Sequence, residues 1–151
     1  LEENAGAIVD RDESAIDTLV ERSVRNKAEI VRQDEKEAGI RALLNLGHSF
    51  GHALESETAY RRFLHGEAVA IGMVTAARLS ERRGLCPAGT STRPVRMLSR
   101  FELPVAIPAD LDVDALAVDR AEQRLRELRY VLCLLLLRRR RRDAAQGGRA
   151  E

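Results

Sequence analysis

The chain has 151 residues, a length that fits one domain and is short for a complete cofactor-dependent enzyme with two lobes. Hydrophobic residues make up 44% and charged residues 32%, which is typical of a soluble globular protein and not of a disordered or membrane chain. A net charge of +1 and an aromatic content of 3% give neither a global positive field nor a base-stacking surface, so we expect no nucleic-acid partner.

The start of the chain and its cysteines indicate a cytoplasmic protein. Residues 1–4 contain no initiator Met and no basic or apolar region of a secretory signal, and the missing Met suggests a fragment. Cys86 and Cys133 form no CxxC pair, so we expect neither a zinc ribbon nor a disulfide framework. The apolar run 130–137 is too short to cross a bilayer, which needs about 20 residues. We therefore expect a soluble protein with no membrane partner.

Two long helices are predicted first. In residues 14–33, apolar side chains recur mostly at three- and four-residue steps, the period of one buried helical face. A second helix is expected over 41–58, although Gly47 and Gly51 each cost about 1 kcal/mol there relative to Ala. The two glycines share one face, where another backbone, a metal or a substrate can come close. Tight helix–helix packing is compatible with that interpretation.

A third helix is predicted over residues 66–83. Glu67 stands near the positive end of its dipole, and Gly84 is placed to end it. The run 68–74 is apolar on every side, which indicates a helix buried in the middle of a bundle.

Shorter elements are expected in the rest of the chain. Residues 95–100 are predicted as a short helix, and Pro104 and Pro108 frame an extended segment. Asp112 can cap a last helix over 113–129.

The end of the chain is the least regular part. Residues 131–137 are either a strand or a helical continuation, because the period of a short apolar run does not separate the two. Residues 138–151 begin with five arginines and are interpreted as a basic, disordered tail, in preference to a nucleic-acid or phosphate site. We therefore predict a mainly α helical bundle over residues 1–137, followed by this tail.

All three histidines of the chain, His48, His52 and His65, fall within eighteen residues. On a helix, His48 and His52 lie one turn apart on one face, and His65 begins the next helix, so the three can converge. Imidazole suits zinc and its neighbours, and a catalytic zinc site often takes three protein ligands. Single histidines are also common as hydrogen-bonded core or capping residues, and the zincin pattern H-E-x-x-H is absent, so this spacing alone does not decide for a metal site.

Cationic and polar side chains accompany the histidines. Arg41 and Asn45 fall near the same helical face, and Lys27 lies on the preceding helix. Arginine offers a fork for carboxylate or phosphate and lysine a mobile point charge, so the set suits a small anionic substrate. Ordinary surface charge is the alternative for Lys27 or Arg41 taken alone.

The lysine, arginine, asparagine and histidines lie in four segments. These are Lys27-Ala28-Glu29-Ile30-Val31, Asp34-Glu35-Lys36-Glu37-Ala38-Gly39-Ile40-Arg41, Leu44-Asn45-Leu46-Gly47-His48-Ser49-Phe50-Gly51-His52-Ala53-Leu54-Glu55 and Leu64-His65-Gly66-Glu67-Ala68-Val69-Ala70-Ile71-Gly72-Met73. Read in this order, they resemble the 3-dehydroquinate synthases. The similarity is dense over residues 14–85 and looser over 86–118, and the double-histidine stretch with His-Gly-Glu at this separation is specific to the sugar phosphate cyclases.

This resemblance implies a fold, a reaction and cofactors. The fold would be the helical C-terminal domain that binds metal and substrate in that family. The reaction would convert a phosphorylated seven-carbon keto-acid to 3-dehydroquinate plus phosphate in the shikimate pathway, with catalytic NAD and a divalent metal, zinc or cobalt. A homodimer is a possible assembly.

The resemblance also implies roles for individual residues. By position, His48 and His65 are expected as metal ligands, and His52 as a substrate-binding, proton-handling partner beside the metal. The positions that match those holding the substrate's phosphate, carboxylate and hydroxyls are Lys27, Arg41 and Asn45.

The chain departs from the family pattern in three ways. The third metal ligand, a glutamate in an Ala-Glu-x-x-Lys stretch, has no equivalent here. The glycine-rich nucleotide loop is also missing, so we predict no NAD-binding residue in this chain. Where the family has Asp-Lys-Lys, the chain has Asp119-Arg120-Ala121. We therefore expect the fragment alone to be inactive in the complete reaction.

Three alternatives stay open. A related cyclase such as 2-deoxy-scyllo-inosose synthase shares the metal histidines, but Arg41 and Asn45 favour a substrate with a carboxylate. A polyol dehydrogenase of the related fold ranks third, because it lacks the Asn-x-Gly-His-x-x-Gly-His stretch. A non-catalytic helical fragment that self-associates and binds metal weakly is the alternative from another class.

Overall fold

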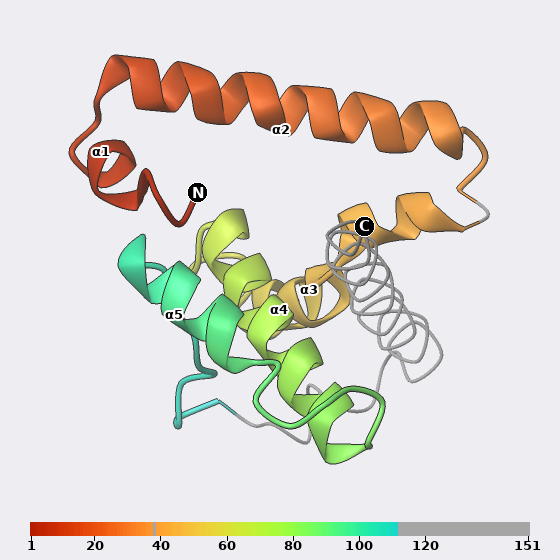
Figure 1. Cartoon of the computed structure of the whole chain (residues 1–151). Coiled ribbons are helices and arrows are strands. Elements are labelled where there is room, and N and C mark those ends of the chain that lie inside the picture. The colour runs from red at the N-terminus through yellow and green to blue at the C-terminus, as the bar shows by residue number, and fades with distance from the viewer. Residues whose placement is uncertain (38, 112–151) are drawn as a thin grey trace, which may run out of the picture.

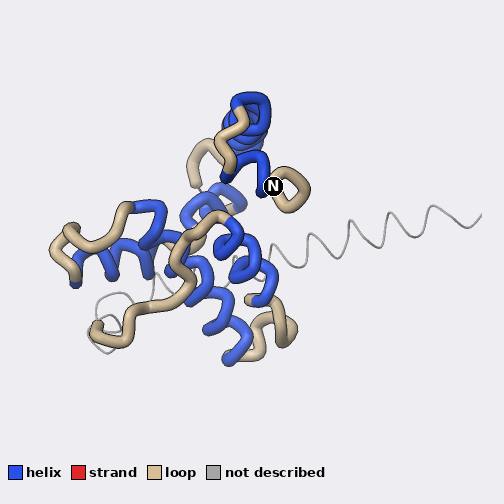
Figure 2. The backbone as a smooth tube through the Cα atoms, turned by 90° about the vertical axis from the view of Figure 1, so that its left-hand side faces the viewer, coloured by secondary structure: helices blue, strands red, loops and turns tan. Residues whose placement is uncertain are grey.

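The computed structural model describes residues 1–37 and 39–111, and within these ranges the chain consists of helices and connecting loops without a strand (Figure 2). The predicted mainly α class is therefore confirmed for this part of the chain. In order, the elements are α1 (Ala5–Val9), α2 (Glu13–Gln33), the 3-10 helix η1 (Ile40–Asn45), α3 (His48–Glu57), α4 (His65–Arg82) and α5 (Thr92–Arg100).

Helix α2 forms where the apolar period predicted it, to within one residue at its start. The Asp12 carboxylate accepts a hydrogen bond from the Ala15 N–H at 2.8 Å and so caps the first turn. Along the helix, Arg32 pairs with Glu29 at 2.8 Å across one turn. These local interactions add to the stability of the helix.

The expectation of a buried face along α2 was wrong for its middle. Among the described residues, α2 buries only Ala15, while Val20 and Val24 are 54% and 63% exposed. Figures 1 and 2 show α2 lying along one side of the molecule, apart from α3 and α4. The apolar period identifies the face that would be buried, but burial requires a neighbour against that face.

The single helix predicted over residues 41–58 is in fact two elements. The 3-10 helix η1 ends at Asn45, and α3 begins at His48. Between them Gly47 has a φ of +87°, a left-handed conformation that side chains disfavour. A Cβ at Gly47 would lie 2.7 Å from the Val69 carbonyl oxygen of α4, so only glycine fits both the turn and the contact.

Helices α3 and α4 approach each other closely, as the two glycines predicted. A Cβ at Gly51 would lie 3.1 Å from the Val69 nitrogen, and one at Gly72 would lie 2.9 Å from the Gly51 nitrogen. Next to this contact, Leu54 of α3 and Ile71 of α4 form the buried core. The hydrophobic side chains packed around that pair are those of Ala53, Phe63, Ile107 and Leu111.

Helix α4 is the central helix, as its apolar run predicted. Its buried residues include Ala68, Ile71, Val74 and Ala76, each fully inaccessible. The Glu67 carboxylate accepts a hydrogen bond from the Leu64 N–H at 2.8 Å at the start of the helix. At the other end, Gly84 has a φ of +65° and its N–H bonds to the Glu81 carbonyl, while the Leu85 N–H bonds to the Ser80 carbonyl. The predicted N-terminal acid and C-terminal glycine are both confirmed.

Helix α5 is longer than predicted, because Pro94 lies in its first turn, where a missing N–H is tolerated. The start of the chain is tied to it, since Arg93 donates two hydrogen bonds of 2.7 Å to the Glu2 carboxylate. A second long-range tie joins Arg62 to Asp110.

Five predictions lie outside the described residues: Asp112 as a cap, the helix over 113–129, the element over 131–137, the tail over 138–151 and the sequence Asp119-Arg120-Ala121. The domain division at residue 137 therefore stays a prediction. No helix in the described part of the chain is both long and apolar enough to cross a membrane.

Candidate metal site

The three histidines converge at the point where the start of α4 faces α3. His48 and His52 lie one turn apart on α3, and His65 is the first residue of α4. Their ring centroids are 5.8 Å apart for His48 and His52, 5.4 Å for His48 and His65, and 5.6 Å for His52 and His65. The glycine contacts between the helices make this approach possible. The structure thus brings together the three residues that the sequence singled out.

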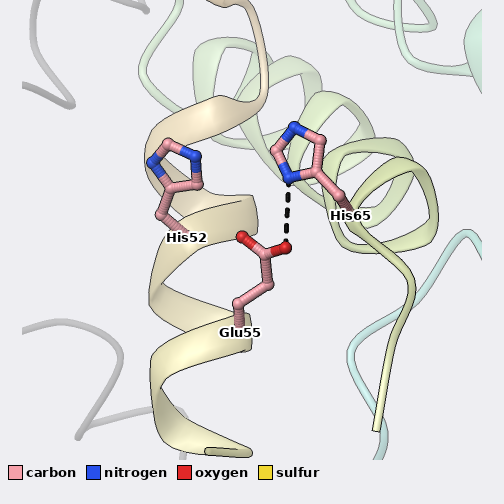
Figure 3. Close-up of side chains that lie close together, drawn as sticks. All are labelled: His52, Glu55 and His65. Carbon is pink, nitrogen blue, oxygen red and sulfur yellow. Dashed lines mark hydrogen bonds and ion pairs between the residues drawn. The ribbon is translucent and has the colours of Figure 1, made fainter. Parts of the chain in front are cut away.

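A fourth side chain in the cluster, Glu55, was missed by the sequence analysis. It lies three residues after His52 on α3, and its Oε1 is 3.1 Å from the His65 Nδ1 (Figure 3). One potential ligand atom each from His52, Glu55 and His65 lies within 4.8 Å of the others. The i, i+3 spacing from His52 was visible in the sequence and could have identified it.

His48 contributes an unusual feature. Its Nδ1 is buried and has no hydrogen-bond partner among the described residues. A buried polar atom is normally paired, so an orphaned one at such a cluster is a candidate ligand or proton carrier.

The donor set fits a divalent transition metal. Imidazole nitrogens and one carboxylate oxygen are a common ligand combination for zinc, and three protein ligands leave a position for water or substrate. The short distances among His52, Glu55 and His65 agree with that chemistry. His48 is not one of those three residues, but its ring lies 5.8 and 5.4 Å from the other two histidine rings and its Nδ1 is orphaned.

The cationic and polar residues predicted around the site lie on two elements. Asn45 donates a hydrogen bond from Nδ2 to the Glu37 Oε1 at 2.7 Å, and the Arg41 Nε lies 4.0 Å from the Glu37 Oε2. Arg41 also donates to the Glu35 carbonyl at 2.7 Å. Lys27 is exposed on α2. Within residues 1–37 and 39–111, no hydrogen bond or ring contact joins Lys27, Arg41 or Asn45 to a histidine.

Known proteins share much of this sequence. Residues 1–125 match the family described as 3-dehydroquinate synthase C-terminal. The chain is 46% identical over 136 residues to the 3-dehydroquinate synthase of Dichelobacter nodosus (strain VCS1703A), covering 87% of this chain and 37% of that protein. It is 51% identical over 124 residues to that of Methylococcus capsulatus (strain ATCC 33009 / NCIMB 11132 / Bath), covering 80% and 34%. The chain thus spans about a third of the length of these curated relatives.

A solved structure shares the arrangement of the helices. It is ValA, the 2-epi-5-epi-valiolone synthase of Streptomyces hygroscopicus subsp. jinggangensis 5008, with NAD+ and Zn2+ bound. The TM-score is 0.59 at 26% identity, and the match covers 90% of this chain and 45% of that one.

Proposed function

Because this chain belongs to the 3-dehydroquinate synthase C-terminal family, as its sequence motifs predicted, we propose that it is the metal- and substrate-binding domain of a 3-dehydroquinate synthase. The proposed reaction turns a phosphorylated seven-carbon keto-acid into 3-dehydroquinate plus phosphate, a carbon–oxygen lyase step of the shikimate pathway. The observation that carries the proposal is the convergence of His48, His52 and His65 between α3 and α4. The chain spans about a third of its relatives, so the complete reaction is assigned to a longer protein.

His48 and His65 are proposed to hold the divalent metal, zinc or cobalt. The orphaned His48 nitrogen supports this role, because metal coordination would satisfy a buried atom that has no partner among the described residues. When bound, the metal would act as a Lewis acid and lower the pKa of a coordinated hydroxyl. His52 is exposed beside His65, and we assign it the exchange of a proton with the substrate.

Arg41, Asn45 and Lys27 are proposed to bind the substrate's carboxylate, phosphate and hydroxyls. Arg41 is only 33% exposed and its guanidinium already contacts the Glu35 carbonyl, so it is held in place before the substrate arrives. The Arg41 fork suits a planar carboxylate or a phosphate, whereas Lys27 offers a mobile charge from α2. The Asn45 amide would exchange its bond to Glu37 for one to a substrate hydroxyl.

NAD is proposed as a cofactor of the longer protein. The glycines of the chain form no G-x-G-x-x-G loop, and the described residues include no strand from which such a loop would lead. No residue of this chain is therefore assigned to NAD. A cytoplasmic location, the lack of a nucleic-acid or membrane partner, and a homodimer all stay predictions.

The first test is zinc binding to this chain by calorimetry. We expect His48→Ala and His65→Ala each to weaken zinc binding by more than about 100-fold. This exceeds the loss of about 10- to 100-fold that follows mutation of a residue that only hydrogen-bonds to a metal ligand. Lys36→Ala is the matched control, because Lys36 is exposed in the turn after α2. Unchanged zinc affinity in both histidine variants would refute the metal assignment and favour a non-catalytic helical fragment.

A second test addresses the substrate class. The zinc-loaded chain would be titrated with a phosphonate that also carries a carboxylate, and with a cyclic sugar phosphate that does not. Arg41→Gln is expected to weaken binding of the first compound, while Arg78→Gln, on the exposed face of α4, leaves it unchanged. Equal binding of both compounds would instead favour a cyclase whose substrate has no carboxylate.

A further inference from the structure

Glu55 is the one charged side chain that is buried among the described residues, at 7% exposure. It lies on the face of α3 that meets the first turn of α4. Burying a carboxylate without a partner is strongly unfavourable, so a buried one is expected to be hydrogen-bonded or to bind a cation. The Glu55 carboxylate contacts His65, whose side chain is 56% exposed. A buried carboxylate is therefore in contact with a histidine ring that is exposed to solvent.

The direction of the hydrogen bond between the two side chains depends on the tautomer of His65. With Glu55 ionised, its carboxylate only accepts hydrogen bonds, and the His65 Nδ1, at 3.1 Å from Oε1, is the donor. A neutral imidazole protonated at Nδ1 carries its lone pair on Nε2. The contact therefore leaves the Nε2 of His65 as the atom able to bind a metal.

Both partners are held by backbone contacts. The Glu55 carbonyl accepts a hydrogen bond from the Tyr60 N–H at 2.7 Å where α3 ends. The start of α4 is held by the bond between the Glu67 carboxylate and the Leu64 N–H, next to His65. A site residue keeps its geometry when its supports are themselves fixed in this way.

We propose that Glu55 is a positioning residue that holds His65 in the Nδ1-protonated tautomer and so presents its Nε2 to the metal. The proposal rests on the proposed function, in which His65 is a ligand. Partners of this kind behind a ligating histidine fix both the tautomer and the ring orientation. The alternative is direct coordination by Glu55, which is compatible with the 4.8 Å limit on the cluster, because one carboxylate oxygen can bind a metal while Oε1 accepts from His65.

The first measurement is the tautomer of His65 in the metal-free chain, from nitrogen-15 NMR of the histidine rings at about pH 8, above the usual histidine pKa. His48→Gln and His52→Gln would assign the signals. We expect Nδ1–H for His65 in the unsubstituted chain and a shift toward Nε2–H in Glu55→Ala. Glu57→Ala, on the exposed side of α3, is the control and should leave the tautomer unchanged. A His65 tautomer that is the same with and without Glu55 would overturn the proposal.

Zinc affinity is the second measurement, on the same variants plus Glu55→Gln, whose neutral amide oxygen can still accept from Nδ1–H. We expect Glu55→Ala to weaken zinc binding by about 10- to 100-fold. Across all variants the loss of affinity should follow the loss of the Nδ1–H tautomer. A Gln variant that keeps this tautomer yet loses as much affinity as Ala would overturn the proposal and make Glu55 a direct ligand.

These results separate the two levels of inference. If the unsubstituted chain binds no zinc, the metal assignment of the proposed function fails, while the metal-free NMR comparison still decides whether Glu55 sets the tautomer. Circular dichroism of each variant would show that the helices are intact.

Discussion

Gly72→Ala tests whether the close contact of α3 and α4 builds the histidine cluster. A Cβ at Gly72 would lie 2.9 Å from the Gly51 nitrogen and nearer still to the Gly47 carbonyl oxygen. These are backbone atoms, so the helices must separate. Overpacking of this kind typically costs about 1–3 kcal/mol, against a gain of about 1 kcal/mol from replacing glycine by alanine within a helix. Because the clash is with backbone atoms, we expect a cost at the upper end of that range and a net destabilisation of about 2 kcal/mol.

The same substitution should also weaken zinc binding, because His48 and His52 belong to α3 and His65 to α4. Thermal unfolding and zinc calorimetry would be measured together. Gly66→Ala is the matched control, since Gly66 also lies on α4 and a Cβ there would have nothing within 4 Å, so neither stability nor zinc affinity should fall. If Gly72→Ala is as stable as this control and binds zinc equally well, the close contact of α3 and α4 does not determine the arrangement of the histidines.

Three further substitutions test local features of the fold. Gly84→Ala should destabilise the chain by about 1 kcal/mol through its φ of +65° alone, because nothing lies within 4 Å of the new Cβ; urea unfolding would measure this. Asp12→Ala should cost about 1 kcal/mol by removing the cap of α2, visible as a loss of helical circular dichroism. The hydrogen bond from Arg62 lowers the pKa of Asp110 below its ordinary value of 3.8, so this tie stabilises the fold above that pH and is lost as the pH falls through the lowered pKa. Arg62→Gln should therefore lower Tm at neutral pH and have less effect in acid, and an equal effect at both would contradict the assignment.

Much of the architecture could be predicted from the sequence because its causes are local. The bounds of α2 and α4 follow from the apolar period and the capping residues. As predicted, Glu67 lies in the first turn of α4 and Gly84 follows its end. The members of the histidine cluster were also predictable, since one helical turn separates His48 from His52 and a short loop leads to His65, while the distances between the rings depend on how α3 packs against α4.

Other features depended on contacts between residues distant in the sequence. The break at Gly47 arises because its backbone meets Val69 of α4, and the apolar side chains in the middle of α2 are exposed because no described element covers them. Nor does residue type show that Asn45 is bonded to Glu37.

Glu55 shows the same division within one side chain. Its position three residues after His52 places it on the same face of α3 as that histidine, and this can be read from the sequence. Its burial and its bond to His65 exist only because three glycines let α4 come close. The sequence by itself determined the helices and the kinds of side chain at the site, since backbone hydrogen bonding and capping act over a few residues. Only the tertiary structure decided which of those side chains meet, because that depends on how closely two helices pack.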